Sequence, residues 1–235
     1  MPETSRYELL VFDWDGTLSD SLQLIIESVR RAILDLGLPP RSERRIRGII
    51  GLGLNDASNR LFPGMSDADC RRLADSYRAH YRELATDPVP LYPAAREVVA
   101  SLHGAGYSLA IATGKSRRGL DLALVDSGLS CYFQSSRCAD ETFSKPHPQM
   151  LQELIDTLGT VPDRTLMIGD SEHDLQMARN AGVDSVALAH GAQSAAHLLK
   201  FEPLICLAAL DELPPWLARK DSDQPPLTGN RVLRP

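Results

Sequence analysis

The spacing of apolar residues changes once in the first part of the chain. Residues 9–12 form a short uninterrupted apolar run, which is typical of a strand buried on both faces in a parallel sheet. From about residue 22 to residue 36 apolar residues recur at helical spacing, and further helical stretches are predicted after Ser42 and Ser66. The interval from about 18 to 89 carries no strand pattern. The sequence therefore predicts one buried strand followed by an all-helical segment.

Beyond residue 92 strand and helix patterns alternate. The strands are expected near residues 107–113, 133–136, 164–170 and 185–189, with a short edge strand at 204–207. Such alternation is typical of a parallel sheet with crossover helices. We therefore expect an α/β fold, a doubly wound parallel sheet with an inserted all-helical cap domain.

The expected domain boundaries follow from these patterns. The core comprises residues 1–17 and 90–218, the helical cap residues 18–89, and the C-terminal tail residues 219–235, which are rich in proline and polar residues. Because the cap follows the first strand, we expect it to lie over the carboxyl end of that strand. There it could exclude water from a site and select substrates.

Composition excludes several classes of partner. A formal net charge of -6 and a pI near 5.5 argue against a nucleic acid polymer or an anionic membrane as partner. No apolar run approaches the length of a membrane span, and the first residues lack the apolar region of a signal peptide. We therefore expect a cytoplasmic protein, as a monomer or homodimer. The four cysteines form no Cys-x-x-Cys pair, so neither a disulfide framework nor a zinc site is indicated.

Two carboxylates follow the first strand. Alternate side chains of an extended segment share a face, so Asp13 and Asp15 can converge on one site while Trp14 points elsewhere. In an open α/β sheet, ligands bind at the carboxyl ends of the strands. Two close carboxylates repel each other and favour a cation, and Mg²⁺ is a hard ion that takes oxygen ligands. The alternative is a turn or helix cap, which the following Gly16 and Thr17 make less favoured.

Three later segments bring polar groups to the same edge of the sheet. Thr113 and Gly114 offer a hydroxyl and backbone N–H groups suited to an anion such as phosphate. Lys145 precedes a helix and could hold a phosphoryl group. Asp170 and Asp174 could face one cation. Each segment also has a simpler explanation, namely a strand-to-helix turn, a solvated lysine and acids at a helix start.

In this order the four segments resemble the motifs of the haloacid dehalogenase superfamily. The resemblance is to its phosphatase branch with a helical cap after the first motif, which includes phosphoglycolate phosphatase. The matching residues are Asp13-Trp14-Asp15-Gly16-Thr17, Thr113-Gly114, Lys145-Pro146, and Gly169-Asp170 with Asp174. The resemblance covers roughly Glu8 to Leu213 and implies a Rossmann-like core. Trp14 replaces the smaller aliphatic residue more usual there, which should matter little if only its backbone meets a metal.

The resemblance implies an Mg²⁺-dependent phosphatase that hydrolyses a small-molecule phosphate monoester. It implies that Asp13 is the nucleophile that becomes a phosphoaspartate, and that Asp15 is the general acid and base. The expected Mg²⁺ ligands are Asp13, the main-chain carbonyl of Asp15, Asp170 and Asp174. The expected phosphoryl-binding groups are Thr113, the Gly114 N–H and Lys145. In such a site, charge neutralisation and in-line positioning are the main catalytic effects.

Proteins of the same fold carry out other reactions, and the sequence bears on each of them. Asp15 argues against a dehalogenase, because that reaction needs no acid for an alkoxide leaving group. A phosphonatase needs a lysine in the cap, and no lysine precedes Lys115. A phosphomutase stays open, since it uses the same acids and differs mainly in a cap that withholds water. A non-catalytic phosphate-ligand sensor is the alternative from another class, although every motif carboxylate is present.

Specificity is expected to reside in the cap. Residues 47–55 look like a loop between helices that reaches down to the site. There Arg47 could pair with a substrate carboxylate or second phosphate, and Gly51 could permit a close backbone approach, with Asn55 nearby. A surface arginine and a simple helix break are the alternatives. Phosphoglycolate, a sugar phosphate and a nucleotide are all compatible with this interpretation.

Overall fold

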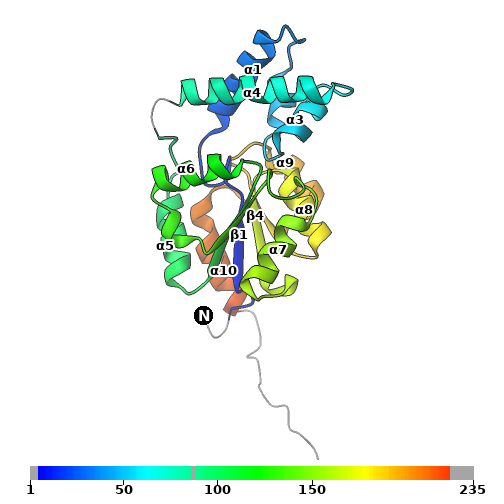
Figure 1. The fold of residues 1–235 in the computed structure, drawn as a ribbon. Helices are drawn as coiled ribbons and strands as arrows, with labels where there is room; N and C mark the ends of the chain where they lie inside the picture. Colours follow the sequence, from blue (N-terminus) through cyan, green and yellow to red (C-terminus); the bar gives the residue numbers. More distant parts are fainter. Residues whose placement is uncertain (1–4, 86–87, 223–235) are drawn as a thin grey trace, which may run out of the picture.

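The computed structural model describes residues 5–85 and 88–222. Figure 1 shows a sheet flanked by helices, with a separate layer of helices over one end. The six strands are β1 (Leu9–Phe12), β2 (Ser108–Thr113), β3 (Ser135–Cys138), β4 (Thr165–Gly169), β5 (Asp184–Leu188) and β6 (Ile205–Leu207). All pairs are parallel, in the order β3-β2-β1-β4-β5-β6. The predicted doubly wound parallel sheet is confirmed, with β6 at its edge.

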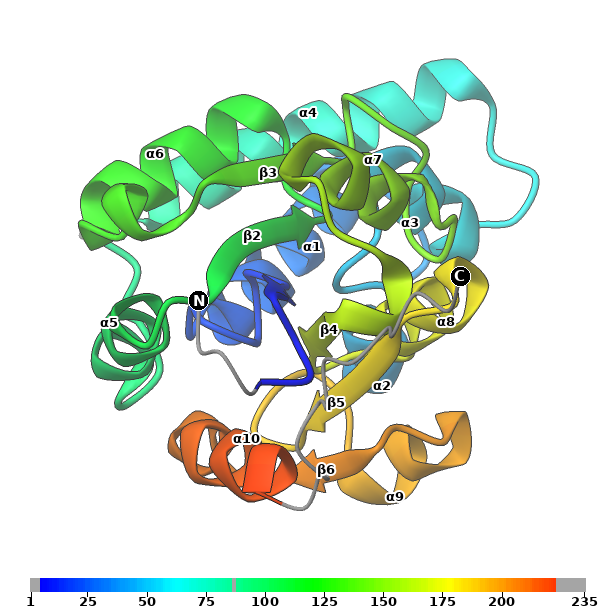
Figure 2. The same cartoon turned by 90° about the horizontal axis from the view of Figure 1, so that it is seen from below.

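Helices cover both faces of the sheet. They are α5 (Ala95–Gly104), α6 (Arg117–Ser127), α7 (Gln149–Leu158), α8 (Glu172–Ala181), α9 (Ala195–Leu198) and α10 (Leu213–Ser222). Figure 2 shows α5 and α10 on one side of the sheet and α7 and α8 on the other. Leu9 and Val11 pack with α7 and α8, whereas Leu10 and Phe12 pack with α5 and α10. This double burial explains why the first strand is apolar at every position.

Four helices form the cap over the carboxyl ends of the strands (Figure 1). They are α1 (Leu22–Asp35), α2 (Glu43–Arg47), α3 (Leu54–Leu61) and α4 (Asp67–Leu84). Their apolar faces meet in a hydrophobic cluster of the cap itself. The two connections to the core run side by side, because Ser19 bridges to Leu91 and the N–H of Tyr92 donates to the Leu18 carbonyl at 2.9 Å. Both ends of the cap are thus anchored at one place.

The structure corrects three details of the predicted elements. The segment expected as a loop over 47–55 is shorter, because α2 extends through Arg47 and α3 already begins at Leu54. The third strand lies two residues later than the pattern suggests. A helix that the pattern does not predict, α10, covers Leu213–Ser222 and includes the first residues of the expected tail. Its two prolines are compatible with a helix because they lie in the first turn, where the backbone N–H needs no partner within the helix. Residues 223–235 lie outside the described residues.

Within residues 5–85 and 88–222, no helix combines the length and the apolar character that a bilayer crossing requires.

Candidate active site

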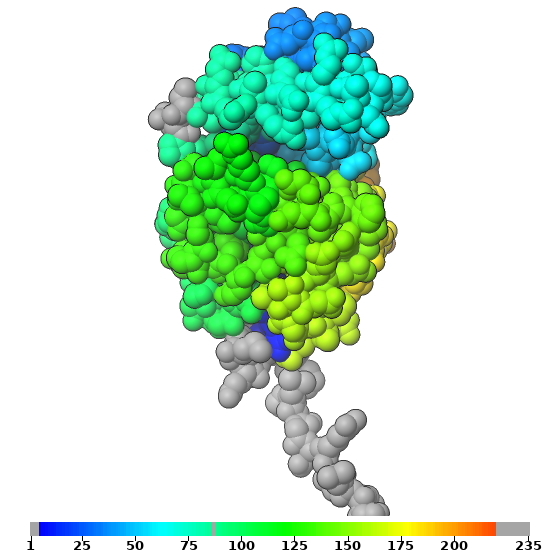
Figure 3. Space-filling model, viewed as in Figure 1, coloured from blue at the N-terminus to red at the C-terminus, as the bar shows by residue number. Residues whose placement is uncertain are grey.

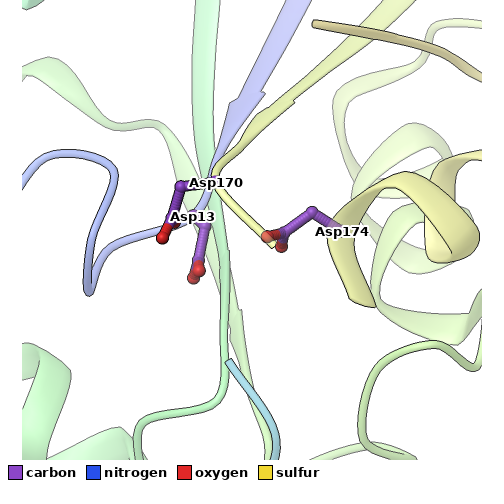
Figure 4. Close-up of side chains that lie close together, drawn as sticks. All are labelled: Asp13, Asp170 and Asp174. Carbon is purple, nitrogen blue, oxygen red and sulfur yellow. The ribbon is translucent and has the colours of Figure 1, made fainter. Parts of the chain in front are cut away.

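Three carboxylates meet where β1 and β4 lie next to each other. Asp13 follows β1 and Asp170 follows β4, and the Asp13 N–H donates to the Ile168 carbonyl at 3.0 Å. Asp174 lies in the first turn of α8. One carboxylate oxygen from each lies within 4.8 Å of the others, and Figure 4 shows the three side chains converging. Successive strands are added on one side of β1 as far as β3 and on its other side from β4 onward, so the strand order switches between β1 and β4. Ligands bind at this switch point in such sheets.

Glycines make room for these carboxylates. A Cβ added at Gly16 or Gly191 would overlap the Asp170 side chain, and one at Gly169 would overlap Asp174. Gly16 also has a φ of 87°, a conformation that favours glycine. These three glycines therefore form a cradle for the acids, since any larger residue at one of these positions would occupy the space of a carboxylate.

Two of the acids are held by hydrogen bonds from the chain. The Thr17 hydroxyl and the Ala192 N–H donate to the two oxygens of Asp170, both at 2.7 Å. The hydroxyl and N–H of Ser171 donate to Asp174 Oδ2 at 2.6 and 3.1 Å. These bonds fix the orientation of both carboxylates and leave Asp13 as the member without such support.

Lys145 is buried between two of the acids. Its Nζ lies 2.8 Å from Asp13 Oδ1 and donates to Asp174 Oδ1 at 2.6 Å. The lysine is 1% exposed, and Asp13 Oδ2 has no hydrogen-bond partner among the described residues. Lys145 brings one positive charge to three buried acids, so the cluster would carry an excess of negative charge if all three were ionised.

Burial and mutual repulsion act on the acidity of this cluster. Burial raises the pKa of Asp13 well above its usual value, against the opposing effect of Lys145, and the charges of Asp174 and Asp170 raise it further. Burial and the charge of Asp174 raise the pKa of Asp170 to about 7. Although burial alone lowers it, Asp13 and Asp174 raise the pKa of Lys145. A bound cation would offset the repulsion that produces these shifts.

The second predicted segment lies directly under the cap. Thr113 ends β2 and is fully buried, and the Gly114 backbone faces the cap loop between α2 and α3. A Cβ at Gly114 would lie only 2.6 Å from the Gly51 carbonyl oxygen. A Cβ at Gly51 would in turn lie 3.9 Å from Asp13 Oδ2. The cap loop therefore passes over both Gly114 and Asp13.

Two hydrogen bonds fasten this loop to the core. The Gly53 N–H donates to the Ser144 hydroxyl at 2.8 Å, next to Lys145. The buried ring of His173 donates from Nε2 to the Gly48 carbonyl at 3.1 Å. The loop is thus held by residues adjacent to the third and fourth motif segments.

Asp15 does not join the acidic cluster through its side chain. Its Oδ1 accepts a 2.6 Å hydrogen bond from Ser21, and Lys115 Nζ donates to Oδ1 and Oδ2 at 2.9 and 3.1 Å. Lys115 also contacts the Tyr81 hydroxyl of α4 at 3.3 Å. Although burial alone lowers it, Asp15 raises the pKa of Lys115, so the lysine stays charged. Asp15 is therefore connected to the cap through Lys115.

The roles of Lys115 and Ser21 as partners of Asp15 were not expected from the sequence. Ser21 directly precedes α1, where a serine often caps a helix, but it makes no capping hydrogen bond to α1. The position of Lys115 could have indicated its role, because it lies two residues after Thr113 and therefore close to the carboxyl end of a strand.

Two of the suggested cap residues have other surroundings in this structure. Arg47 forms an ion pair with Glu43 at 3.1 Å, and Asn55 is exposed in the first turn of α3. Neither lines the cavity beneath the cap. Of the three cap suggestions, only Gly51 lies beside the carboxylates.

A cavity of about 660 Å³ separates the cap from the carboxyl edge of the sheet. On the core side it is bordered by Asp13, Asp15, Thr113, Gly114 and Lys115. Figure 3 shows the recess between the cap helices and the α6 side of the core. The nucleophile candidate and Asp15 therefore both face a space that a substrate can enter.

The fold and the site define an α/β enzyme with an acidic centre at the strand ends, and the comparisons place it in a family. The model of the haloacid dehalogenase-like hydrolase family matches residues 10–188, which is more than half of the chain. The chain belongs to this family, so the family expected from the four motifs is confirmed.

Individual relatives agree with this assignment. "Probable phosphatase IndB" of Dickeya dadantii (strain 3937) is 33% identical over 209 residues, which are 87% of this chain and 91% of the relative. "Pyrophosphatase PpaX" of Bacillus cereus (strain AH820) is 30% identical over 215 residues, 91% of this chain and 97% of the relative. The crystal structure of a predicted phosphoglycolate phosphatase from Haemophilus somnus 129pt matches with a TM-score of 0.80 and 25% identity, covering 90% of this chain and 98% of that one.

Proposed function

We propose that this hydrolase is a phosphatase that cleaves small-molecule phosphate monoesters through a covalent intermediate on Asp13. The observation that carries the proposal is the Asp13 carboxylate, which borders the cavity with an unpartnered Oδ2 while Lys145 holds its other oxygen. An ionised aspartate in this position is a nucleophile that needs no base to activate it. Lys145 favours the ionised form, and a bound cation would offset the burial and the carboxylate charges that raise the pKa of Asp13. The relatives named as phosphatases support the same choice.

The reaction divides into two steps. In the first, an Asp13 oxygen forms a bond to phosphorus while the bond to the leaving-group oxygen breaks, and Asp15 gives its proton to that oxygen. In the second, Asp15 takes a proton from water, whose oxygen attacks the phosphorus and breaks the bond to Asp13. Inorganic phosphate leaves, and both aspartates return to their starting states.

Three core groups are assigned to the transferring phosphoryl group. Thr113 and Gly114 border the cavity at the end of β2, and Lys145 touches Asp13 at 2.8 Å. A hydroxyl, a backbone N–H and an ammonium at these places neutralise and orient the phosphoryl oxygens. Because Lys145 is buried, its charge acts in a medium of low dielectric constant, where it has a stronger effect than at the surface.

The acidic cluster fits Mg²⁺. Asp13, Asp170 and Asp174 bring oxygens within 4.8 Å of one another, the glycine cradle keeps the space open, and Asp13 Oδ2 lacks a partner. These three carboxylates would hold the ion, with the Asp15 main-chain carbonyl as the further ligand that the family resemblance implies. When bound, Mg²⁺ would neutralise charge on the phosphate and the nucleophile.

Gly191→Ala tests this assignment without removing a carboxylate. The added methyl group overlaps Asp170, so the side chain must shift. We expect the Mg²⁺ concentration for half-maximal activity to rise about 10- to 100-fold, as for other losses of support around metal ligands. The matched control is Gly104→Ala at the end of α5, where no neighbouring atom lies within 4 Å. An unchanged Mg²⁺ requirement in Gly191→Ala would show that Asp170 does not hold the ion.

The decisive experiment for the activity is a phosphate-release screen. The purified protein is incubated with para-nitrophenyl phosphate and a panel of metabolite phosphates, with Mg²⁺ and separately with a chelator. We expect release that depends on Mg²⁺. A lack of release from every compound would overturn the proposal, and isomerisation of a sugar phosphate without release would identify a phosphomutase instead.

A further inference from the structure

The cavity above Asp13 extends from the core into the interior of the cap. Its walls include residues of α1, α3, α4 and the loop between α2 and α3, together with α6 of the core. Several of these wall residues belong to the hydrophobic cluster of the cap, among them Val29, Ile49, Leu61 and Leu73. The cavity therefore reaches the hydrophobic cluster of the cap.

The cavity opens to the surface between the cap and the core (Figure 3), so it is a cleft and not an internal packing void. Its volume of about 660 Å³ lies in the range of small-molecule sites, which are mostly apolar with a few polar groups that fix orientation. We conclude that the cavity is a place for a ligand.

The charged lining residues that are not exposed to solvent are concentrated at one end. Asp13, Asp15, Thr113 and Lys115 border the cavity on the core side. Tyr81 stands at the junction, because its hydroxyl contacts Lys115 at 3.3 Å while its ring lies 5.8 Å from the ring of Tyr77. Beyond this point the cap contributes mainly aliphatic side chains. The cavity is thus polar where chemistry takes place and apolar beyond it.

The interior offers little to a second anionic group. Among the described lining residues, Lys115 is the one cation that is not solvent-exposed, and it is already paired with Asp15 at 2.9 Å. The other lining cations, Arg78, Arg82 and Arg118, are exposed to solvent. A carboxylate or second phosphate inside the cap would lose its hydration without gaining a partner, which is costly.

We infer that the substrate is a phosphate monoester of a bulky apolar alcohol, whose phosphate lies at Asp13 and whose hydrocarbon part fills the cap. The inference rests on the proposed phosphatase function and adds the nature of the leaving group. Burial raises the pKa of the Tyr77 and Tyr81 phenols, which agrees with a dry wall at the start of the apolar part. Compounds with a charged leaving group, such as phosphoglycolate and pyrophosphate, fit this cavity poorly.

A series of n-alkyl phosphates from ethyl to octyl tests the inference. Their leaving groups have nearly the same basicity, so chain length changes the contact with the cavity and little else. We expect kcat/KM in Mg²⁺ to rise about three- to fourfold for each added methylene until the cavity is filled. Phosphoglycolate and pyrophosphate should be slower than hexyl phosphate by at least about tenfold.

A matched pair of variants locates the effect in the cap. Ala74 on α4 lines the cavity, and Ala79 on the same helix is exposed outside it. Ala74→Leu should lower the ratio of octyl to ethyl kcat/KM by about tenfold or more, because its larger side chain occupies the space of the alkyl chain. Ala79→Leu should leave that ratio unchanged. Thermal unfolding of both variants checks that the fold is retained.

The outcomes separate the two proposals. Phosphate release with a flat or falling chain-length series, or a preference for phosphoglycolate or pyrophosphate, overturns the apolar leaving group and leaves the phosphatase function standing. A lack of release from every compound, para-nitrophenyl phosphate included, overturns the phosphatase function and the inference with it. Because the series is measured on the unaltered enzyme, it decides even if Ala74→Leu fails to fold.

Discussion

Asp13→Asn should lower phosphate release by about 10⁴-fold or more, since removal of a covalent nucleophile has effects of this order. The amide has the shape of the carboxylate but is a poor nucleophile for phosphorus. It fits the same place after β1, beside Lys145, so the site should keep its geometry. The loss is therefore expected in the chemical step and not in the fold.

The stability of this variant gives a second, independent expectation. Burial raises the pKa of Asp13 above its unfolded value, so its ionised form costs stability once the pH exceeds that unfolded value. The neutral amide carries no such cost. Without Mg²⁺ at neutral pH, we expect Asp13→Asn to unfold at the same temperature as the unaltered protein or at a higher one.

Both quantities can be measured on one preparation. Phosphate release from para-nitrophenyl phosphate reports the activity, and thermal unfolding with and without Mg²⁺ reports the fold. Glu at this position is the control for charge, because Asp13→Glu keeps the carboxylate but moves it by one methylene. Activity of Asp13→Asn near that of the unaltered enzyme would remove Asp13 from the role of nucleophile.

The position of the main acidic groups was predictable because it depends on local patterns. A buried strand ends where its apolar run ends, so Asp13 and Asp170 had to lie at strand ends. Parallel strands bring their carboxyl ends to one edge, which gathers residues that are distant in the chain. Lys145 could be placed near this edge by its order in the chain, although its complete burial could not.

The environment of Asp15 could not be predicted in the same way. It depends on Lys115, which lies 100 residues further along, and on Tyr81 from the cap. Such contacts arise from the docking of cap on core, which leaves no periodic signal. Arg47, which was suggested as a ligand for a substrate carboxylate, forms an ion pair with Glu43 four residues before it on the same helix. This contact depends on helical spacing and needs no docking of cap on core.

The cavity next to the cap could not be predicted from the sequence either. An apolar stripe on a helix shows that a face is buried, but not whether its neighbour is another side chain or a ligand. Val29 and Leu73 therefore look like ordinary core residues in the sequence. Only the folded structure shows that these residues lie next to the cavity between cap and core.

Asp15→Asn should separate the two chemical steps. The amide cannot give a proton to the leaving group or take one from water, so steady-state release should fall about 10²- to 10⁴-fold. With para-nitrophenyl phosphate, however, the leaving group departs without a proton, and transfer to Asp13 should still occur. We therefore expect one equivalent of nitrophenolate per enzyme in a rapid first phase, followed by very slow turnover as the phosphorylated enzyme accumulates.

Rapid mixing and intact-protein mass measurement test this expectation together. The size of the nitrophenolate burst gives the amount of enzyme that completes the first step. The mass should show one phosphoryl group on Asp15→Asn and none on a double variant that also carries Asp13→Asn.

Ser21→Ala is the control, because it removes the 2.6 Å hydrogen bond to Asp15 but keeps the carboxylate, so its turnover should fall by no more than about tenfold. Full steady-state hydrolysis by Asp15→Asn, or a phosphoryl group that persists in the double variant, would refute the division of labour between the two aspartates. If both steps fail equally in Asp15→Asn with this activated substrate, then Asp15 acts mainly by holding Lys115 and the cap in place, and not by moving protons.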